Sequence, residues 1–326
     1  MRTKIVYILV SNPNDLYYEQ ALMSLYSLRL HNPYTDVFLV VDHVTDRTLK
    51  ADRTEIFIYT TFKKVVTVPE EYSPKQRSRF LKTSLRRYID GDFLYIDVDT
   101  VVARPLDDID YVEINIGAVP DMHMPFSRNP LKKRYDRDLI HIMDTYNIYD
   151  DKYFNSGVML VRDTYETHTF YENWHKCWLH GVKKNVNMDQ PSLMAANCIC
   201  HAPIQELKGE WNCQINLNGL NYFAHAYIIH YFASHKMSTF LIGNPSVCAE
   251  IKEKGCIPNE LKPLLHNPYA GFSSPNKVIG ENEFDLFNSR MRKVYLKYPR
   301  VWAIFEYQAK LLGYMESIKK KMLRIK

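Results

Sequence analysis

Two aspartates separated by one residue stand at the end of an apolar run, in the segment Asp97-Val98-Asp99. Carboxylates at the end of a buried strand are costly unless something neutralises them. Residues two apart on a regular strand point to the same face. Their oxygens suit a hard divalent cation, Mg²⁺ or Mn²⁺, which can in turn bind a diphosphate. The alternative for an isolated Asp-x-Asp is a solvated turn.

The elements that must position these aspartates form an α/β pattern. Residues 5–10 are a short β-branched run, 18–31 carry apolar residues at helical spacing, and 36–42 are a second buried-type strand. Strand, helix and strand within about forty residues predict a βαβ unit and a parallel sheet. We predict one strand over 92–102, so the aspartates would lie where open α/β sheets place ligands. A helix over 78–88 and strands over 114–119 and 156–161 complete the pattern.

Composition is typical of a globular protein with a real core. The chain has 326 residues, of which 46% are hydrophobic and 24% charged. No apolar run approaches the roughly 20 residues of a membrane-spanning helix, and the N-terminus does not resemble a signal peptide. We therefore expect a cytoplasmic location. The six cysteines are too sparse for a disulfide scaffold, which favours buried free thiols.

Positive charge is concentrated at the C-terminus. Residues 290–326 hold eleven Lys or Arg against two acids, a net charge of +9, whereas the whole chain carries +5. An acidic body with a basic tail argues against nucleic-acid binding. The tail is also apolar at helical spacing, which predicts a basic amphipathic helix on an anionic membrane surface. A helix packed on the body is the alternative. We place the domain boundary at residue 245, giving domains 1–245 and 246–326.

The segment around the aspartates resembles the signature of glycosyltransferase family 8. Four further segments match the family's motifs in the family's order, and together the matches cover about residues 3–240. The five segments are Leu94 to Val102, Ser78 to Lys82, Tyr153 to Leu160, Asn187 to Pro191 and Ile229 to Phe232.

This resemblance implies a GT-A fold, a Rossmann-like, mixed but mostly parallel sheet flanked by helices, here with a C-terminal helical basic appendage. It also implies a retaining transfer of glucose or galactose from a UDP-sugar. The implied metal ligands are Asp97, Asp99 and His230, and a histidine nitrogen favours Mn²⁺ over Mg²⁺. A buried core histidine is the alternative reading of His230.

Further roles follow from the same resemblance. Gln190 would lie beneath the donor sugar, Asp189 would bind its hydroxyls or cap a helix, and Asn155 would lie near its anomeric carbon or only form a turn. Tyr18 is an alternative to Tyr17 for stacking on uridine. The donor-binding residues implied are Val10, Ser11, Tyr17, Arg79, Lys82, Asp97, Val98, Asp99 and Lys236.

The assignment has one ambiguity and one departure from the family's motif. Arg77 and Arg86 compete with Arg79 and Lys82 for the donor's phosphate or sugar. The family continues His-x-x-Gly-x-x-Lys, and the spacing fits Lys236, but Ala233 stands where the family has glycine.

The expected partners are a UDP-hexose, a glycan or lipid-linked oligosaccharide acceptor of bacterial surface polysaccharide or lipopolysaccharide synthesis, and the inner face of the cell membrane. A metal-dependent phosphohydrolase and a non-catalytic glycan-binding module on the same fold are the alternatives. The segment 121–151 is expected to act as a lid or to face the acceptor.

Overall fold

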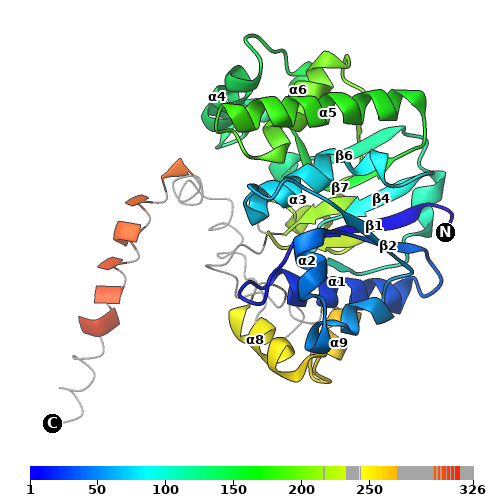
Figure 1. Cartoon of the computed structure of the whole chain (residues 1–326). Coiled ribbons are helices and arrows are strands. Elements are labelled where there is room, and N and C mark those ends of the chain that lie inside the picture. Colours follow the sequence, from blue (N-terminus) through cyan, green and yellow to red (C-terminus); the bar gives the residue numbers. More distant parts are fainter. Residues whose placement is uncertain are drawn as a thin grey trace. The chain divides into compact units, whose positions relative to one another are not determined.

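A computed structural model describes residues 1–215, 217–232, 242 and 244–269, together with residues scattered between 297 and 315. The chain divides into two compact units, residues 1–129 with 134–271, and residues 130–133 with 272–326. The first unit contains the sheets and the helices labelled in Figure 1, except for residues 132 and 133 at the start of α4. None of the helices among the described residues is long and apolar enough to cross a membrane.

The first unit is built on a seven-stranded sheet in the order β3-β2-β1-β4-β7-β6-β8. Neighbouring strands run parallel except at β7, which is antiparallel to both β4 and β6. The predicted mixed, mostly parallel sheet is therefore confirmed. The strands are β1 (Lys4–Leu9), β2 (Val37–Asp42), β3 (Phe62–Val66), β4 (Phe93–Ile96), β6 (Ile116–Pro120), β7 (Phe154–Val161) and β8 (Ile204–Glu206).

A second, three-stranded sheet has the order β5-β10-β9. It consists of β5 (Thr100–Val102), β10 (Ile228–His230) and β9 (Cys213–Gln214). The prediction of one strand over residues 92–102 was wrong, because β4 ends at Ile96 and the chain enters the small sheet at Thr100. Asp97 to Asp99 form the turn between the two sheets, where both carboxylates retain contact with solvent.

Helices cover both faces of the large sheet (Figure 1). On one face, the core joins β1, β4 and β7 to side chains of α3, α5 and α6. On the other face, the β1 residue Tyr7 contacts Ser24 of α1 through its hydroxyl, at 3.1 Å. The helices are α1 (Tyr17–His31), α2 (His43–Thr48), α3 (Pro74–Thr83), α4 (Lys132–Ile142), α5 (Tyr165–Lys183), α6 (Asp189–Ile199), α7 (Leu220–Phe223), α8 (Pro245–Lys254) and α9 (Lys262–His266).

The start of α3 is fixed by local sequence. Ser73 is its N-cap and Pro74 is the first helical residue. The side chains of Ser73 and Gln76 form a reciprocal capping box across this first turn. Such a box satisfies backbone N–H groups that have no partner within the helix. The predicted helix over 78–88 is thus an α-helix that ends at Thr83, followed by the 3₁₀ turn η3 (Leu85–Arg87).

The region after residue 245 contributes to the first unit. Helices α8 and α9 pack against α1, so they belong to the first unit although they follow residue 245. The functional division into domains 1–245 and 246–326 stays a prediction. In the second unit, the described residues between 300 and 315 are helical, and several of their apolar side chains are exposed, Ile304 at 59% and Tyr307 at 68%. The basic end of the predicted helix, residues 316–326, lies outside the described residues.

All six cysteines are free thiols, and three of them are buried. Free thiols were predicted, but Cys198 and Cys200 are only partly buried and Cys256 is exposed.

Candidate functional site

The turn that carries the two aspartates is tied to the neighbouring strand and to itself. The backbone N–H of Asp97 donates to the carbonyl of Gly157 on β7 at 2.8 Å. The hydroxyl of Thr100 donates to the Asp97 carbonyl at 2.8 Å. These contacts fix the backbone on both sides of the turn, and the carboxylates of Asp97 and Asp99 project from it with side-chain exposures of 27% and 22%.

The small sheet brings a histidine to this turn from more than one hundred residues further along the chain. His230 on β10 is the antiparallel partner of Thr100 on β5, and the N–H of Tyr231 donates to the Asp99 carbonyl at 3.1 Å. The His230 Nε2 atom lies 3.2 Å from Asp99 Oδ1. Strand pairing therefore brings the imidazole to the aspartates.

Asp97, Asp99 and His230 form a group of potential metal ligands. One ligand atom from each residue lies within 4.8 Å of the others, and no second group of this kind occurs among the described residues. Two carboxylates and an imidazole are a donor set that suits Mn²⁺, and the carboxylates also suit Mg²⁺. The residues present thus fit a divalent cation.

Gly157 on β7 provides the space that the imidazole occupies. A Cβ atom at this position would lie 2.3 Å from His230 Cε1, 2.8 Å from its Nδ1 and 2.9 Å from Asn155 Oδ1. Distances below 3.0 Å are not tolerated without movement. The glycine in the Phe-Asn-Ser-Gly segment is therefore required for close packing of the histidine on the strand.

Two basic side chains of α3 join the metal-ligand group to α6. Lys82 Nζ lies 3.1 Å from Asp97 Oδ1 and 3.3 Å from Asp189 Oδ2, and the Lys82 side chain is only 3% exposed. Arg79 Nε lies 2.8 Å from Asp189 Oδ1, and the Ser156 hydroxyl donates to Asp189 Oδ2 at 2.6 Å. Asp189 is thus held at both carboxylate oxygens.

Electrostatics keep this network charged. Burial by itself would raise the pKa of Asp189, but the positive charges of Arg79 and Lys82 hold that pKa well below its ordinary value. Burial likewise would lower the pKa of Arg79, yet the carboxylates of Asp189 and Asp97 raise it. Burial and the neighbouring Asp97 raise the pKa of Tyr95 far above its ordinary value, so its hydroxyl stays protonated and donates to Asp97.

The competing arginines lie elsewhere. Arg77 Nε is 2.6 Å from Asp42 at the end of β2. Arg86 Nη2 is 2.9 Å from Asp163, and its Nη1 donates to the Gly91 carbonyl at 2.7 Å. Of the four basic residues considered from the sequence, Arg79 and Lys82 are the two that contact the carboxylates of this site.

Gln190 and Asn155 differ in how their amides are used. The Gln190 Nε2 atom is buried and has no hydrogen-bond partner among the described residues. Asn155 is 3% exposed, and its amide donates to Asp121 at 3.1 Å and accepts from the Gly157 N–H at 2.9 Å. The N-cap of α6 is Met188, with Asp189 the first helical residue, so Asp189 does not cap the helix.

Around the end of β1, Val10 and Ser11 are buried. The Ser11 hydroxyl contacts Asp15 at 2.6 Å and Arg53 at 2.6 Å.

Two tyrosines follow at the start of α1. Burial raises the pKa of Tyr17; the charge of Arg79 lowers that pKa, and the charges of Asp15 and Asp99 raise it. Tyr17 therefore lies within electrostatic reach of the metal-ligand group. Tyr18 is 2% exposed and packs under the guanidinium of Arg53, 4.6 Å from its ring centroid. Val98 is half-buried between the two aspartates.

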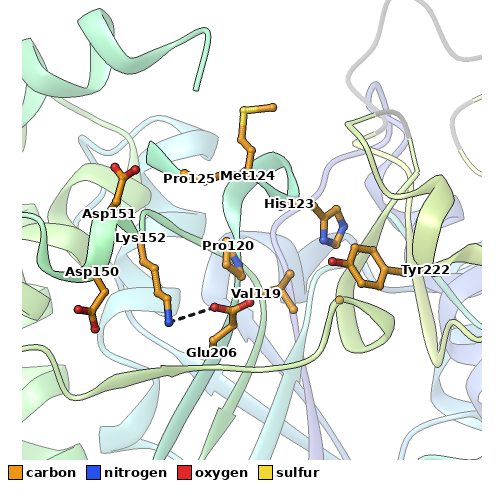
Figure 2. Close-up of a pocket in the computed structure, with 11 residues that line it drawn as sticks. Val119, Pro120, His123, Met124, Pro125, Asp150, Asp151, Lys152, Glu206 and Tyr222 are labelled. Carbon is orange, nitrogen blue, oxygen red and sulfur yellow. Dashed lines mark ion pairs between the residues drawn. The ribbon is translucent and has the colours of Figure 1, made fainter. Parts of the chain in front are cut away.

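A cavity of about 260 Å³ has His123 and Tyr222 in its wall. Figure 2 shows Tyr222 and His123 on one side of it and the Lys152–Glu206 ion pair on another. The His123 and Tyr222 rings lie 4.6 Å apart. The remaining lining residues are Val119, Pro120, Met124, Pro125, Asp150, Asp151 and Gly209.

His123 connects this cavity to the metal-ligand group. Its Nε2 accepts from the backbone N–H of Gln214 at 3.0 Å, and Gln214 is the strand partner of His230. The pKa of His123 is lowered to about 4, mainly by burial, against the opposing effect of a backbone hydrogen bond at Asn212 and with a smaller lowering by the nearby His230. No individual role was predicted from sequence for His123, Asn212, Asp121 or Tyr95, although Tyr95 lies in the motif segment Leu94 to Val102 and Asp121 and His123 lie in the segment 121–151.

Lys236 and Ala233 lie outside the described residues.

The sequence model of the family described as "Glycosyl transferase family 8" matches residues 8–237. The chain belongs to this family. It is a glycosyltransferase, and its sheet has the GT-A arrangement. No curated protein matches the sequence.

Solved structures of glycosyltransferases are similar to this member of family 8 in fold. Mouse xyloside xylosyltransferase 1 in its apo form has a TM-score of 0.50 and 12% identity, over 72% of this chain and 99% of that chain. An active-site mutant of LgtC has a TM-score of 0.50 and 15% identity, over 80% and 99%. The bifunctional glycosyltransferase WbbM has 17% identity and a TM-score of 0.48, over 72% of this chain but only 46% of its own.

Proposed function

We propose that this family 8 protein is a metal-dependent, retaining glycosyltransferase that moves glucose or galactose from a UDP-sugar to a glycan acceptor. The observation that carries the proposal is the convergence of Asp97, Asp99 and His230 within 4.8 Å. The adjacent cationic side chains of Arg79 and Lys82 provide charge complementary to a diphosphate. We assign the reaction to synthesis of a bacterial surface polysaccharide or lipopolysaccharide.

Asp97, Asp99 and His230 would hold the ion, which we take to be Mn²⁺, with Mg²⁺ as the alternative. When bound, the ion supplies a Lewis acid that stabilises the charge developing on the departing nucleoside diphosphate. Tyr95 and Lys82 contact Asp97 in the structure and orient its carboxylate. In the same proposal Lys236 contributes a phosphate contact.

The donor nucleoside would lie at the end of β1. In this proposal the half-buried ring of Tyr17 stacks on uracil, and Tyr18 packs against the guanidinium of Arg53. The backbones of Val10, Ser11 and Val98 would line the same site. Since the Ser11 hydroxyl already contacts Asp15 and Arg53, its part in donor binding would be to shape the loop.

The transferred sugar would lie between α6 and the metal-ligand group. A buried amide nitrogen without a partner carries a free-energy cost of about 1–3 kcal/mol that a ligand oxygen would relieve, so we place Gln190 against the donor sugar. Asp189 would bind sugar hydroxyls through the carboxylate lone pairs that Arg79, Lys82 and Ser156 do not occupy. We propose that Asn155 supports the site and does not contact the sugar, because both the nitrogen and the oxygen of its side-chain amide are already hydrogen-bonded.

The reaction proposed is a front-face displacement. A double displacement would need a carboxylate nucleophile beneath the sugar, yet Asp97 and Asp99 are assigned to the metal and Asp189 is held by Arg79, Lys82 and Ser156. The leaving diphosphate would accept the proton of the attacking hydroxyl. Preorganised dipoles such as the Gln190 amide would stabilise the positive charge on the sugar.

We place the acceptor in the cavity of Figure 2. Its walls combine aromatic edges with carboxylates and an amine, groups that hydrogen-bond sugar hydroxyls in many orientations. Five of its eleven lining residues come from the segment 121–151 that was expected to face the acceptor. His123 links this cavity to the metal-ligand group through Gln214.

A peripheral location on the cytoplasmic leaflet completes the proposal. The C-terminal helix would lie on anionic lipids, with exposed apolar side chains such as Ile304 and Phe305 inserted at the interface. A lipid-linked acceptor would then be presented to an enzyme at the same surface.

Incubation with UDP-glucose or UDP-galactose, with and without a chelator, tests the reaction. Chelator-sensitive release of UDP, with the sugar transferred, is the expected result. Release of phosphate from simple esters would favour a phosphohydrolase, and no turnover of any UDP-sugar would favour a glycan-binding module. Asp99→Asn should abolish release, whereas Asp46→Asn, which removes only a surface ion pair with Lys63, should retain it.

A further inference from the structure

A row of buried polar side chains runs from the metal-ligand histidine into the protein. His230 Nδ1 lies 2.9 Å from Asn212 Oδ1, and Asn212 Nδ2 lies 3.0 Å from Asn155 Oδ1. Asn155 Nδ2 in turn lies 3.1 Å from Asp121 Oδ1. All four side chains are at most 3% exposed, so their hydrogen bonds are protected from exchange with water.

The direction of every hydrogen bond in this row follows from one backbone group. The N–H of Gly157 can only donate, so the Asn155 atom that it contacts at 2.9 Å must be the carbonyl oxygen. The Asn212 atom facing that oxygen must then be its amide nitrogen. Consequently the Asn212 carbonyl faces His230, and the imidazole must donate from Nδ1.

The far end of the row agrees with this direction. With its oxygen toward Gly157, Asn155 presents its amide nitrogen to Asp121, which is an acceptor. The second Asp121 oxygen accepts from Asn129 Nδ2 and from the Tyr135 hydroxyl, each at 3.2 Å. The carboxylate is therefore anchored, and both amide dipoles between it and His230 point the same way.

We propose that Asn212 and Asn155 are positioning residues that hold His230 with its proton on Nδ1 and relay the negative charge of Asp121 to its ring. This inference rests on the proposed metal site. The tautomer leaves the Nε2 lone pair, 3.2 Å from Asp99 Oδ1, available to a cation.

The physical effect is that of a carboxylate behind a metal-ligating histidine, extended by two amides. A hydrogen-bond acceptor at the distal nitrogen fixes ring orientation and makes the ligating nitrogen more basic, and its loss typically weakens metal binding 10–100-fold. Aligned amides polarise one another in a low-dielectric interior. Asp121 can therefore act on His230 although the two do not touch.

Nitrogen-15 NMR of the protein labelled at histidine, in metal-free buffer, tests the tautomer without any reaction. The His230 signals are identified by their absence in His230→Gln. We expect a proton on Nδ1 in the wild-type protein, and loss of this preference in Asn212→Ala. A wild-type ring without a proton on Nδ1 would overturn the proposal.

Titration calorimetry with Mn²⁺ tests the consequence. Asn212→Ala should raise the Kd at least tenfold, and Asp121→Asn, which keeps an acceptor for Asn155 but removes the charge, should raise it less. The control is Asn197→Ala, which removes an equally buried amide that caps the Ile204 N–H at 3.0 Å and should change the Kd by less than threefold.

An unchanged Kd in Asn212→Ala would overturn the proposal. Failure of the wild-type protein to bind Mn²⁺ would instead refute the proposed metal site, while the NMR experiment would still decide the tautomer. Since the tautomer is determined in the wild-type protein, that measurement also decides the matter if Asn212→Ala does not fold.

Discussion

Replacing Gly157 with alanine tests how His230, the histidine of the proposed metal site, is positioned. The new Cβ would lie 2.3 Å from His230 Cε1, and ordinary contact begins at 3.4 Å. The ring or the β7 backbone must therefore move by about 1 Å. Metal–ligand distances tolerate changes of about 0.2 Å, so we expect the imidazole to be lost as an effective ligand.

The expected magnitudes follow from this displacement. Insertion of a methyl group into a packed site costs about 1–3 kcal/mol of unfolding free energy. The Kd for Mn²⁺ should rise at least tenfold, the scale seen when a ligand loses its orienting contacts. Both quantities are accessible, the first by urea unfolding and the second by titration calorimetry or by the paramagnetic resonance of free Mn²⁺.

The matched control is Gly117→Ala on the neighbouring strand. Its Cβ would meet Leu207 side-chain atoms at 2.8–2.9 Å, so it should destabilise the fold without changing the Kd. In a His230→Ala background, Gly157→Ala should lower the unfolding free energy by less than it does in the wild-type protein, because the ring that the new methyl group would displace is gone. An unchanged Kd in Gly157→Ala would refute the account of how His230 is held.

Further predictions concern the network around the site and the core. Gln190→Ala should lower kcat for sugar transfer at least tenfold with little change in KM for the donor, as measured by release of UDP; nearly full turnover would remove Gln190 from the mechanism. Asp189→Asn should lower the unfolding free energy by about 3 kcal/mol in urea titrations, the low end for a broken buried pair, since Arg79 loses its carboxylate partner while Lys82 keeps Asp97; a loss below about 1 kcal/mol would contradict this. Burial lowers the pKa of His175 to about 4, so below its unfolded pKa of about 6.5 the unfolded chain binds a proton that the folded chain does not. Stability should therefore fall by about 2 kcal/mol between pH 7 and pH 5, and His175→Gln should remove that share of the pH dependence.

The sequence predicted the central sheet because its strands are long apolar runs. Residues 5–10 and 36–42 became β1 and β2 as a parallel pair. The strand over 92–102 could not be divided from sequence, since Thr100 to Val102 is as apolar and β-branched as the residues before Asp97. The break depends on pairing with β10, a contact between distant segments that no local pattern encodes.

The same distinction holds for the site. Motif residues such as Asp97, Asp99 and His230 were found because their spacing matches a family, and the structure places them together. Asn212 and Asp121 belong to no recognised motif, and their importance lies in which atom faces which neighbour. The role of Asn155 likewise could not be separated from that of Gln190 until hydrogen bonds showed which amide is engaged.

Diffraction from crystals soaked with Mn²⁺ and UDP, recorded at the manganese absorption edge, would locate the ion itself. We expect one strong anomalous peak bounded by a carboxylate oxygen of Asp97, a carboxylate oxygen of Asp99 and the Nε2 atom of His230, with the diphosphate on its open side. A bound UDP with no anomalous peak among these three side chains, or a peak elsewhere, would contradict the proposed metal site.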